Sequence, residues 1–303
     1  MSSGYRFRIL DVFTHRPYAG SPLAVLPEAQ GLSADQMQRI ASEFSFSATA
    51  FVRPPRSPSY THRVRIFTPS KELPFAGHAT IGSALTLAME GDPSPEFVFE
   101  EDIGPVRVSM RPGTGAGTAW MWAAKLPERG PEPPPPVALA TLLSLKVTDL
   151  LAGDWKPVAV SAGIPFLVVP VRDLDALRRA RLDIARWREI LANWWAAQVY
   201  VVTPVEQGAE WRFRTRMFGP GIGIDEDPAA GAAATALPGW LVPRLKPRDG
   251  LLSFIIEQGI EMGRPSTLPV EVDVEGGVIA AVRVGGAAVT IAEGRIHPPP
   301  RQP

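Results

Sequence analysis

The sequence predicts an α+β protein built from two domains. At 303 residues the chain is long for a single hydrophobic core, because chains beyond about 250 residues usually divide into domains. Alternating apolar runs typical of strands dominate both halves, and helical periodicity is confined to a few segments. A proline-rich run, P-E-R-G-P-E-P-P-P-P at residues 127–136, is the sharpest break in composition and indicates an extended linker.

We therefore expect an N-terminal domain over residues 1–128 and a C-terminal domain over residues 137–296, joined by a linker at residues 129–136. The last strand either closes the second domain or crosses back to the first. Residues 297–303, H-P-P-P-R-Q-P, are expected to form a loose tail.

Composition limits the kinds of partner and of chemistry. Lys plus Arg and Asp plus Glu both number 31, so no excess of positive charge indicates a nucleic acid or an anionic membrane surface. The chain has no cysteine, which excludes disulfides, thiolate metal sites and cysteine nucleophiles or bases. No apolar signal region or run of membrane-spanning length is present. We expect a small-molecule partner and a cytoplasmic location.

The first domain is expected to open with strands over residues 6–13 and 23–26. The clearest helix start follows, with Ser33 as N-cap and Gln36 as its capping-box partner. The inner face of this helix is formed by Met37, Ile40, Ala41 and Phe44. A strand over residues 46–52 comes next. Its small residues, Ser47, Ala48 and Thr49, indicate close packing more strongly than a cavity, and residues 97–100 and 106–110 predict a hairpin.

The stretch R-I-F-T-P-S-K-E-L-P-F-A-G-H-A-T-I-G, residues 65–82, delivers a helix start at Gly77 and His78 after a short strand. Unpaired backbone N–H groups at a helix start can hold a carboxylate or an oxyanion. Histidine, with an ordinary pKa of about 6.5, suits proton transfer near neutrality. No metal-ligand spacing surrounds His78, and these residues alone favour a partly buried structural histidine.

In the second domain we expect a helix over residues 137–151, two strands within residues 157–171 and helical structure over residues 173–193. Further strands are expected at residues 199–203 and 211–217, and three or four more between residues 251 and 296. The G-P-G-I-G run at residues 219–223 lacks the spacing of a dinucleotide fingerprint. No cofactor is therefore assigned.

A weak internal repeat links the two halves. R-M-F-G-P at residues 216–220 echoes R-I-F-T-P at residues 65–69, and G-A-A-A-T, which begins at Gly231, echoes G-H-A-T-I, which begins at Gly77. The spacing from phenylalanine to glycine differs between the copies, so chance similarity is the alternative. In a true repeat, the two helix starts could face one cleft. Asp227 precedes the second start, as either a helix cap or a ligand-contacting group.

Taken together, these motifs resemble the PhzF-like family of phenazine biosynthesis, whose best known members isomerise a dihydro-hydroxyanthranilate and share the diaminopimelate epimerase-like fold. The similarity spans nearly the whole chain. It is carried by D-V-F-T at 11–14, A-G-S-P-L-A-V at 19–25, F-T-P at 67–69, P-F-A-G-H-A-T at 74–80, E-D-P-A at 226–229 and Q-G-I-E-M-G-R-P-S at 258–266.

The resemblance implies two similar domains, each a curved, mostly antiparallel sheet wrapped around a central helix, with the active site in the cleft between them and frequent homodimerisation. It implies proton-shift chemistry without a cofactor or metal. His78 and Asp227 match the family's catalytic histidine and aspartate, and Gly77 and Gly231 match its glycines.

The chain departs from the family at the principal acid/base. The family's Ser-Glu-Thr step reads Ser47-Ala48-Thr49 here, so a methyl group replaces the catalytic glutamate. Ser21 stands in place of an asparagine and Ala232 in place of a serine. A positioned general acid/base contributes about 10²- to 10⁴-fold to rate, so this loss would weaken the family's proton shift without abolishing binding.

Three interpretations follow. The first, which we favour, is an isomerase of altered chemistry acting on a small carboxylate-bearing, cyclic or aromatic metabolite, with His78 and Asp227 as catalytic residues. Its substrate would also meet residues Ser21, Ser47, Ala48, Gly77, Gly231 and Ala232. The second is a binding protein without catalysis. The third is that Ala48 is an introduced substitution, which leaves Ala232 unexplained.

Overall fold

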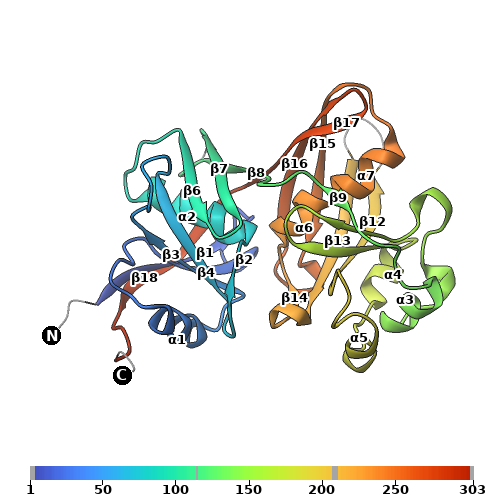
Figure 1. Cartoon of the computed structure of the whole chain (residues 1–303), viewed down its shortest axis with the longest axis horizontal. Coiled ribbons are helices and arrows are strands. Elements are labelled where there is room, and N and C mark those ends of the chain that lie inside the picture. The colour runs from blue at the N-terminus through green and yellow to red at the C-terminus, as the bar shows by residue number, and fades with distance from the viewer. Residues whose placement is uncertain (1–3, 114, 207–210, 301–303) are drawn as a thin grey trace. The chain divides into compact units, whose positions relative to one another are not determined.

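The structure is a computed structural model that describes residues 4–113, 115–206 and 211–300. The chain forms two compact units (Figure 1). The first takes in residues 1–124 and 285–303, and the second takes in residues 125–284. The proline-rich run thus lies in the second unit, where its residues Glu128 and Arg129 form a short strand that pairs with Ser161 and Val160.

Nine strands and two helices of the first unit lie among its described residues. The strands are β1 (Tyr5–Val12), β2 (Ser21–Leu26), β3 (Ala48–Arg53), β4 (His62–Phe67), β5 (Glu72–Leu73), β6 (Glu96–Glu101), β7 (Gly104–Arg111), β8 (Thr118–Trp122) and β18 (Ala288–Ile296). The helices are α1 (Ala34–Phe44) and α2 (Gly77–Met89).

The sheet of the first unit runs from β18 through β1, β2, β3, β4, β6 and β7 to β8. The β2–β3 and β4–β6 pairs are parallel, and the other pairs are antiparallel. β5 adds to β4 as a short antiparallel strand. The sheet joins the two ends of the chain, because β1 pairs with β18.

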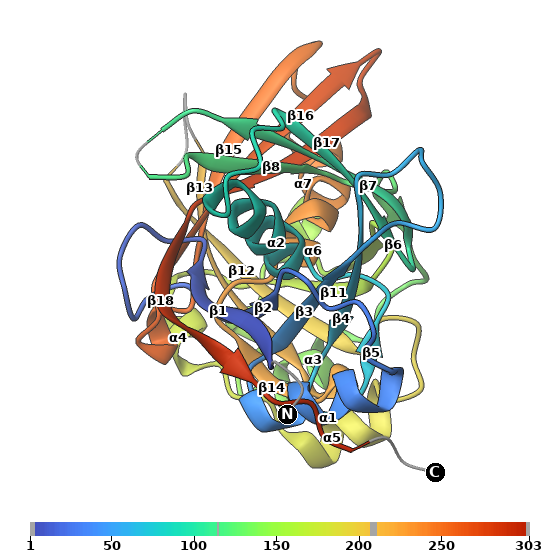
Figure 2. The same cartoon turned by 90° about the vertical axis from the view of Figure 1, so that its left-hand side faces the viewer.

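Helix α2 is the core of this unit. Strands β1, β2, β3, β4, β7 and β8 all contact it (Figure 2). Every residue from Gly77 to Leu87 is buried. Such a helix needs apolar or small residues on all faces, as its sequence G-H-A-T-I-G-S-A-L-T-L-A-M provides. A Cβ added at Gly82 would lie 2.3 Å from a methyl carbon of Leu23, so a larger residue would require the Leu23 side chain to move.

Helix α1 confirms the predicted capping box. The Ser33 hydroxyl accepts the Gln36 backbone N–H, and the Gln36 side chain accepts the Ser33 backbone N–H. Residues 297–300, part of the expected tail, form no regular element but contact α1: the Gln36 amide donates to the carbonyl of Pro299 at 2.6 Å and Arg39 donates to that of Pro300. Proline carbonyls are strong acceptors, and α1 supplies the donors.

The second unit contains nine strands and five α-helices among its described residues. The strands are β9 (Glu128–Arg129), β10 (Val158–Ser161), β11 (Pro165–Pro170), β12 (Gln198–Glu206), β13 (Trp211–Gly219), β14 (Ile224–Asp227), β15 (Gly250–Gln258), β16 (Ser266–Glu275) and β17 (Val278–Gly286), of which β17 ends in the first unit. The helices are α3 (Pro136–Leu142), α4 (Leu174–Arg179), α5 (Ile184–Ile190), α6 (Gly231–Ala236) and α7 (Pro238–Leu245). Single 3₁₀ turns occur at η1 (Val147–Asp149), η2 (Gly153–Trp155), η3 (Pro220–Ile222) and η4 (Ile260–Met262).

The sheet of the second unit repeats the first in order and direction. It runs β9, β10, β11, β12, β13, β15, β16 and β17, with β14 added to β13. The β11–β12 and β13–β15 pairs are parallel, as the β2–β3 and β4–β6 pairs are in the first unit. The α+β prediction is therefore confirmed, with two similar curved sheets.

The repeat extends to single side chains. Arg65 makes two hydrogen bonds of 2.6 Å to Glu72, and its guanidinium carbon lies 5.2 Å from the centre of the Phe67 ring. In the second unit, Arg216 makes two bonds of 2.8 Å to Glu226 and lies 5.0 Å from the Phe218 ring. The predicted internal repeat is thus confirmed, and the 3₁₀ turn η3 accounts for the longer spacing in the second copy.

Three sequence-based element predictions need correction. The helix expected over residues 137–151 ends at Leu142, because Ser144 adopts a left-handed conformation with φ of 57°. The helical stretch at residues 173–193 is two helices, each capped by an aspartate, Asp173 and Asp183. The strand expected from residue 46 begins at Ala48, which leaves Ser47 just ahead of it.

Candidate active site

Three predicted site residues of the first unit lie in contact. The Ser47 hydroxyl is 3.4 Å from Nε2 of His78 and 3.5 Å from the Ser21 hydroxyl. Both distances are at the long end for hydrogen bonds. The parallel pairing of β2 with β3 brings the two serines together, since Ser21 begins β2 and Ser47 lies just ahead of β3.

His78 is held at the start of α2. It is 4% exposed, on the first turn, beside Gly77. The N-cap residue, Ala76, has no side-chain acceptor for the N–H groups of this turn, and the turn contains no acidic residue. The positive end of a long buried helix therefore lies at the histidine, and such an end stabilises anionic groups.

The backbone before Ser21 is fixed by glycine. Gly20 has a φ of +65°, and a Cβ there would lie 2.2 Å from the carbonyl oxygen of Val12. No other residue type fits this close approach. The turn at Gly20 therefore fixes the position of Ser21, the first residue of β2.

Ala48 lies at the start of β3 and is fully buried. It pairs with Leu23 of β2. Its methyl group offers no proton-carrying atom. The Ser47 hydroxyl contacts Nε2 of His78, and the Ser21 hydroxyl contacts that of Ser47.

The other predicted site residues belong to the second unit. Asp227 ends strand β14 and is 5% exposed, and its Oδ1 accepts the backbone N–H of Ala229 at 3.0 Å. The carboxylate thus forms a turn ahead of α6 and is not that helix's N-cap, which is Ala230. Gly231 and Ala232 open α6, a helix of only six residues.

The buried Gln258 side chain supports Asp227. The Gln258 amide donates to the Asp227 carbonyl at 2.6 Å, and its oxygen accepts the Thr215 hydroxyl at 3.1 Å. The Tyr200 side chain is also fully buried. Burial raises the pKa of Tyr200, and the charge of Asp227 raises it further.

Sequence reasoning missed Glu101 at the end of β6. Its side chain is buried, and Oε1 lies 2.7 Å from the Thr80 hydroxyl on the first turns of α2. Burial raises the pKa of Glu101 to about 8, and the neighbouring Asp102 adds to the shift. Alternate residues Phe97, Phe99 and Glu101 are all buried, so the period of the strand was the signal that could have revealed this position.

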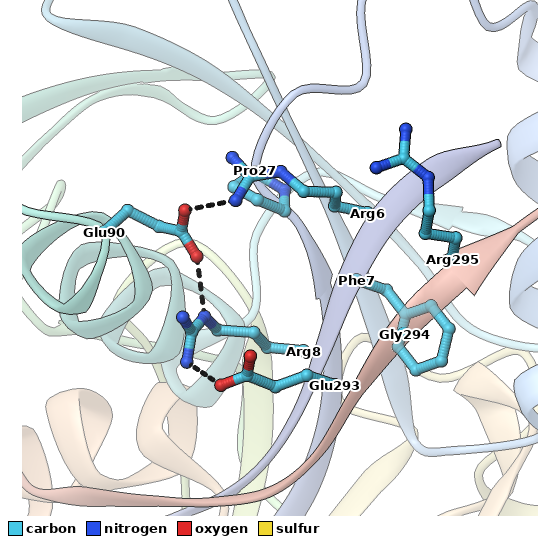
Figure 3. Close-up of a pocket in the computed structure, with 8 residues that line it drawn as sticks. All are labelled: Arg6, Phe7, Arg8, Pro27, Glu90, Glu293, Gly294 and Arg295. Carbon is cyan, nitrogen blue, oxygen red and sulfur yellow. Dashed lines mark hydrogen bonds and ion pairs between the residues drawn. The ribbon is translucent and has the colours of Figure 1, made fainter. Parts of the chain in front are cut away.

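A groove of about 270 Å³ lies at the other end of α2 (Figure 3). Arg6 and Arg8 of β1 each donate to Glu90 at 2.7 Å, and Arg8 also bonds Glu293. Glu90 lies twelve residues beyond His78, a distance of roughly 18 Å along a helix. None of the predicted site residues lines this groove, and carboxylates already neutralise Arg6 and Arg8.

No group of three or more histidine, aspartate or glutamate side chains suited to a metal ion occurs in the described part of the chain. Within residues 4–113, 115–206 and 211–300, every helix is too short or too polar to span a bilayer.

Comparison with known proteins places the chain. A sequence profile described as phenazine biosynthesis-like protein, PhzC-PhzF, matches residues 10–294. An uncharacterized isomerase from Mesorhizobium japonicum is 42% identical, covering 96% of this chain and 98% of its own length. The trans-2,3-dihydro-3-hydroxyanthranilate isomerase of Pseudomonas aeruginosa is 32% identical, covering 97% of this chain and 99% of its own.

The fold is also similar to that of solved PhzF-family structures. The crystal structure of a PhzF-family phenazine biosynthesis protein from Bacillus anthracis superposes with a TM-score of 0.86 at 25% identity, covering 98% of this chain and 99% of that one. Relatives named as isomerases thus match the chain over almost its full length. The resemblance inferred from the motifs is confirmed, and the chain belongs to the PhzC-PhzF family of phenazine biosynthesis-like proteins.

Proposed function

We propose that this protein is an isomerase that moves a proton within a small carboxylate-bearing, cyclic or aromatic metabolite, with His78 as the proton carrier. The observation that carries the proposal is the placement of His78 at the start of α2, within 3.4 Å of the Ser47 hydroxyl. The isomerase names of its relatives support the reaction class.

In the proposed reaction the substrate carboxylate binds at the Gly77 helix start. The His78 imidazole takes a proton from one ring carbon as that C–H bond breaks, and the electron pair shifts along the adjacent double bond. The imidazolium then returns the proton to a second carbon, so the histidine ends unchanged. Ser47, which also contacts Ser21, holds the ring nitrogen in place, and Asp227 binds an amine or hydroxyl of the substrate.

The altered chemistry follows from Ala48. With a methyl group at this position, one imidazole must serve as both acid and base. The loss of a positioned carboxylate predicts turnover of roughly 10²- to 10⁴-fold below that of a relative that retains it.

A binding protein without catalysis is the second candidate, and the full burial of Ala48 favours it. In this case the helix start at Gly77 and the hydroxyls of Ser21 and Ser47 hold a carboxylate ligand, and no proton moves.

One experiment separates the two functions. The protein is incubated in D₂O with trans-2,3-dihydro-3-hydroxyanthranilate, the compound in the name of the P. aeruginosa relative, and with a panel of cyclic carboxylates. Thermal shift reports binding and mass spectrometry reports deuterium in the recovered ligand. Uptake of deuterium supports the isomerase, and a stabilising ligand that never takes up deuterium supports the binding protein.

We also propose that the chain works as a homodimer, as the family resemblance implies. Light scattering coupled to size exclusion tests this directly. A mass near 65 kDa, about twice that of the 32.7 kDa chain, is expected, and a monomer mass at micromolar concentration would contradict it.

A further inference from the structure

We infer that Glu101 is a positioning residue: a buried carboxylic acid that keeps its proton in the working protein and, through Thr80, fixes the first turns of α2 on which Gly77 and His78 lie. Its catalytic consequence rests on the function proposed above, whereas its protonation and its contact with Thr80 do not.

Both short contacts of the Thr80 hydroxyl are satisfied together when Glu101 is protonated. The Thr80 hydroxyl lies 3.1 Å from the Ala76 carbonyl and 2.7 Å from Oε1 of Glu101. A hydroxyl has one hydrogen, and a carbonyl oxygen can only accept. When Thr80 donates to Ala76, the shorter bond needs its hydrogen from the acid. Both bonds form fully only when Glu101 is protonated.

The surroundings of Glu101 disfavour its charged form. Among the described residues no arginine, lysine or histidine forms an ion pair with it, and its second oxygen has no hydrogen-bond partner. Its neighbour Asp102 carries a negative charge and pairs with Arg63 at 3.7 Å. Across the sheet, Glu101 pairs with Gly104 of β7. Close to it, the carbonyl of Pro74 accepts the backbone N–H of Ile103. His78, on the same helix end as Thr80, is the nearest titratable group along α2.

The second copy of the repeat places a neutral group at the same position. Arg63 pairs with Glu100 across the β4–β6 strands, and Arg214 pairs with Glu257 across the β13–β15 strands. The next residue in each copy is Glu101 or Gln258, respectively, and both are buried. An amide has nearly the shape of a protonated carboxyl group, so the two copies use neutral side chains of similar size at equivalent positions.

The two side chains also do equivalent work. Gln258 donates to the carbonyl of Asp227, four residues ahead of the Gly231 helix start. Glu101 bonds Thr80, three residues beyond the Gly77 helix start. In each copy a strand end is thus tied to the segment that carries a predicted site residue. In the first copy that tie depends on a proton.

The test uses protein labelled with ¹³C at the glutamate carboxyl carbons, followed by NMR from pH 5 to pH 9. The signal that disappears in Glu101→Gln belongs to Glu101. We expect it to keep the shift of a protonated acid until about pH 8. A signal already at the ionised position at pH 6 would overturn the inference, and so would a Glu101→Gln protein that fails to fold at pH 6, since an amide should replace a neutral acid.

The positioning role has its own readout in the imidazole signals of His78. In the wild type they should move as Glu101 loses its proton. In Thr80→Val, which removes the hydroxyl and keeps the shape, Glu101 still titrates but the His78 signals should stay still. Equal movement in Thr80→Val would overturn the role of Thr80. Neither measurement uses a substrate, so failure of the isomerase proposal would show in the deuterium experiment and not here.

Discussion

The two copies of the repeat share a scaffold and differ in chemistry. Both have the same strand order, the same bidentate arginine–glutamate pair beside a phenylalanine, and a helix that starts with glycine. At equivalent positions the first copy has Leu73 and His78, and the second has Asp227 and Ala232. The scaffold is duplicated, whereas one copy carries the imidazole and the other carries the carboxylate.

The helices differ as well. Helix α2 runs unbroken for 13 residues and is buried on all sides. Its counterpart α6 stops after six residues, and Pro238 begins the separate helix α7. A proline cannot donate the backbone bond that continues a helix, although it suits the first position of a new one. The stronger helix dipole therefore belongs to the copy that carries His78, which supports placing the substrate carboxylate there.

The largest effect is expected at position 48. The strand registers make Gln198 the equivalent residue in the second copy. Ala48→Glu restores a carboxylate beside Ser47 and should raise turnover of a trans-2,3-dihydro-3-hydroxyanthranilate-type substrate by about 10²- to 10⁴-fold. Overpacking at a fully buried site should also cost about 1–3 kcal/mol of stability.

Ala48→Gln is the matched control for this change. It has the same bulk as Ala48→Glu and makes the first copy resemble the second, but it supplies no acid. Steady-state kinetics of the two variants should differ by the full gain in turnover. Equal rates would show that a carboxylate at position 48 has no catalytic partner in this chain.

The second largest effect is the pH dependence that Glu101 gives to the protein's free energy of unfolding. The folded state holds this proton up to about pH 8, whereas the unfolded chain releases it near the ordinary value of 4.5. The folded state therefore binds more protons between these values, and the free energy of unfolding falls as pH rises from about 4.5 to about 8. Each pKa unit corresponds to about 1.4 kcal/mol, so the total fall is about 3–5 kcal/mol.

Glu101→Gln, which copies Gln258, should remove that fall. Its stability advantage over the wild type should grow from pH 5 to pH 8 in urea unfolding. The reciprocal change, Gln258→Glu, should add a similar fall to the second copy, because the new acid loses the bond to the Asp227 carbonyl once ionised. A wild type and a Glu101→Gln protein whose stability curves stay parallel across this range would refute the buried acid.

A smaller difference is expected between the repeated ion pairs. Arg216 is 5% exposed and also donates to the Leu177 and Ala180 carbonyls, whereas Arg65 is 14% exposed. Removing the partner of a more deeply buried charge costs more, so Glu226→Gln should destabilise by about 2–4 kcal/mol. Glu72→Gln should cost about 1 kcal/mol, because solvent screens the pair. Equal costs in chemical denaturation would mean that burial does not distinguish the copies.

The smallest effect concerns the helices inserted after the second strand of each copy. Ser33→Ala removes the cap of α1 and should cost about 1 kcal/mol. Asp183→Ala, at the cap of α5, is the counterpart, and its Oδ1 accepts two backbone N–H groups. Thermal unfolding should show similar losses for both, and no measurable loss for Ser33→Thr, which keeps the acceptor. A destabilised Ser33→Thr would point to packing instead of capping.

The sequence was informative where structure is local. Ser33 and Gln36 lie three residues apart, and the contacts that cap α1 need no distant partner. The helix expected over residues 137–151 was wrong because its apolar spacing continues past Leu142, whereas the chain turns at Ser144 and Leu145 donates back to Ala140. No glycine marks that left-handed turn, so the sequence gives little warning of it.

The candidate site was predictable only in part. The positions of His78 and Asp227 came from motifs, but the contact of Ser21 with Ser47 depends on the parallel register of β2 and β3, which are far apart in the chain. Glu101 was missed because a glutamate is expected at the surface. Its burial results from the pairing of β6 with its neighbours beneath α2, a tertiary property that no local pattern of charge conveys.

The central claim is that His78 carries the proton, and its most direct test is deuterium exchange by His78→Ala. This change gives the first copy an alanine after the helix-starting glycine, as Ala232 follows Gly231 in the second. The wild type should transfer deuterium from D₂O into trans-2,3-dihydro-3-hydroxyanthranilate or another accepted cyclic carboxylate. His78→Ala should bind the same ligand, as shown by thermal shift, with exchange slowed by about 10²- to 10⁴-fold. Exchange at the wild-type rate in His78→Ala would contradict the assignment of His78 as the proton carrier.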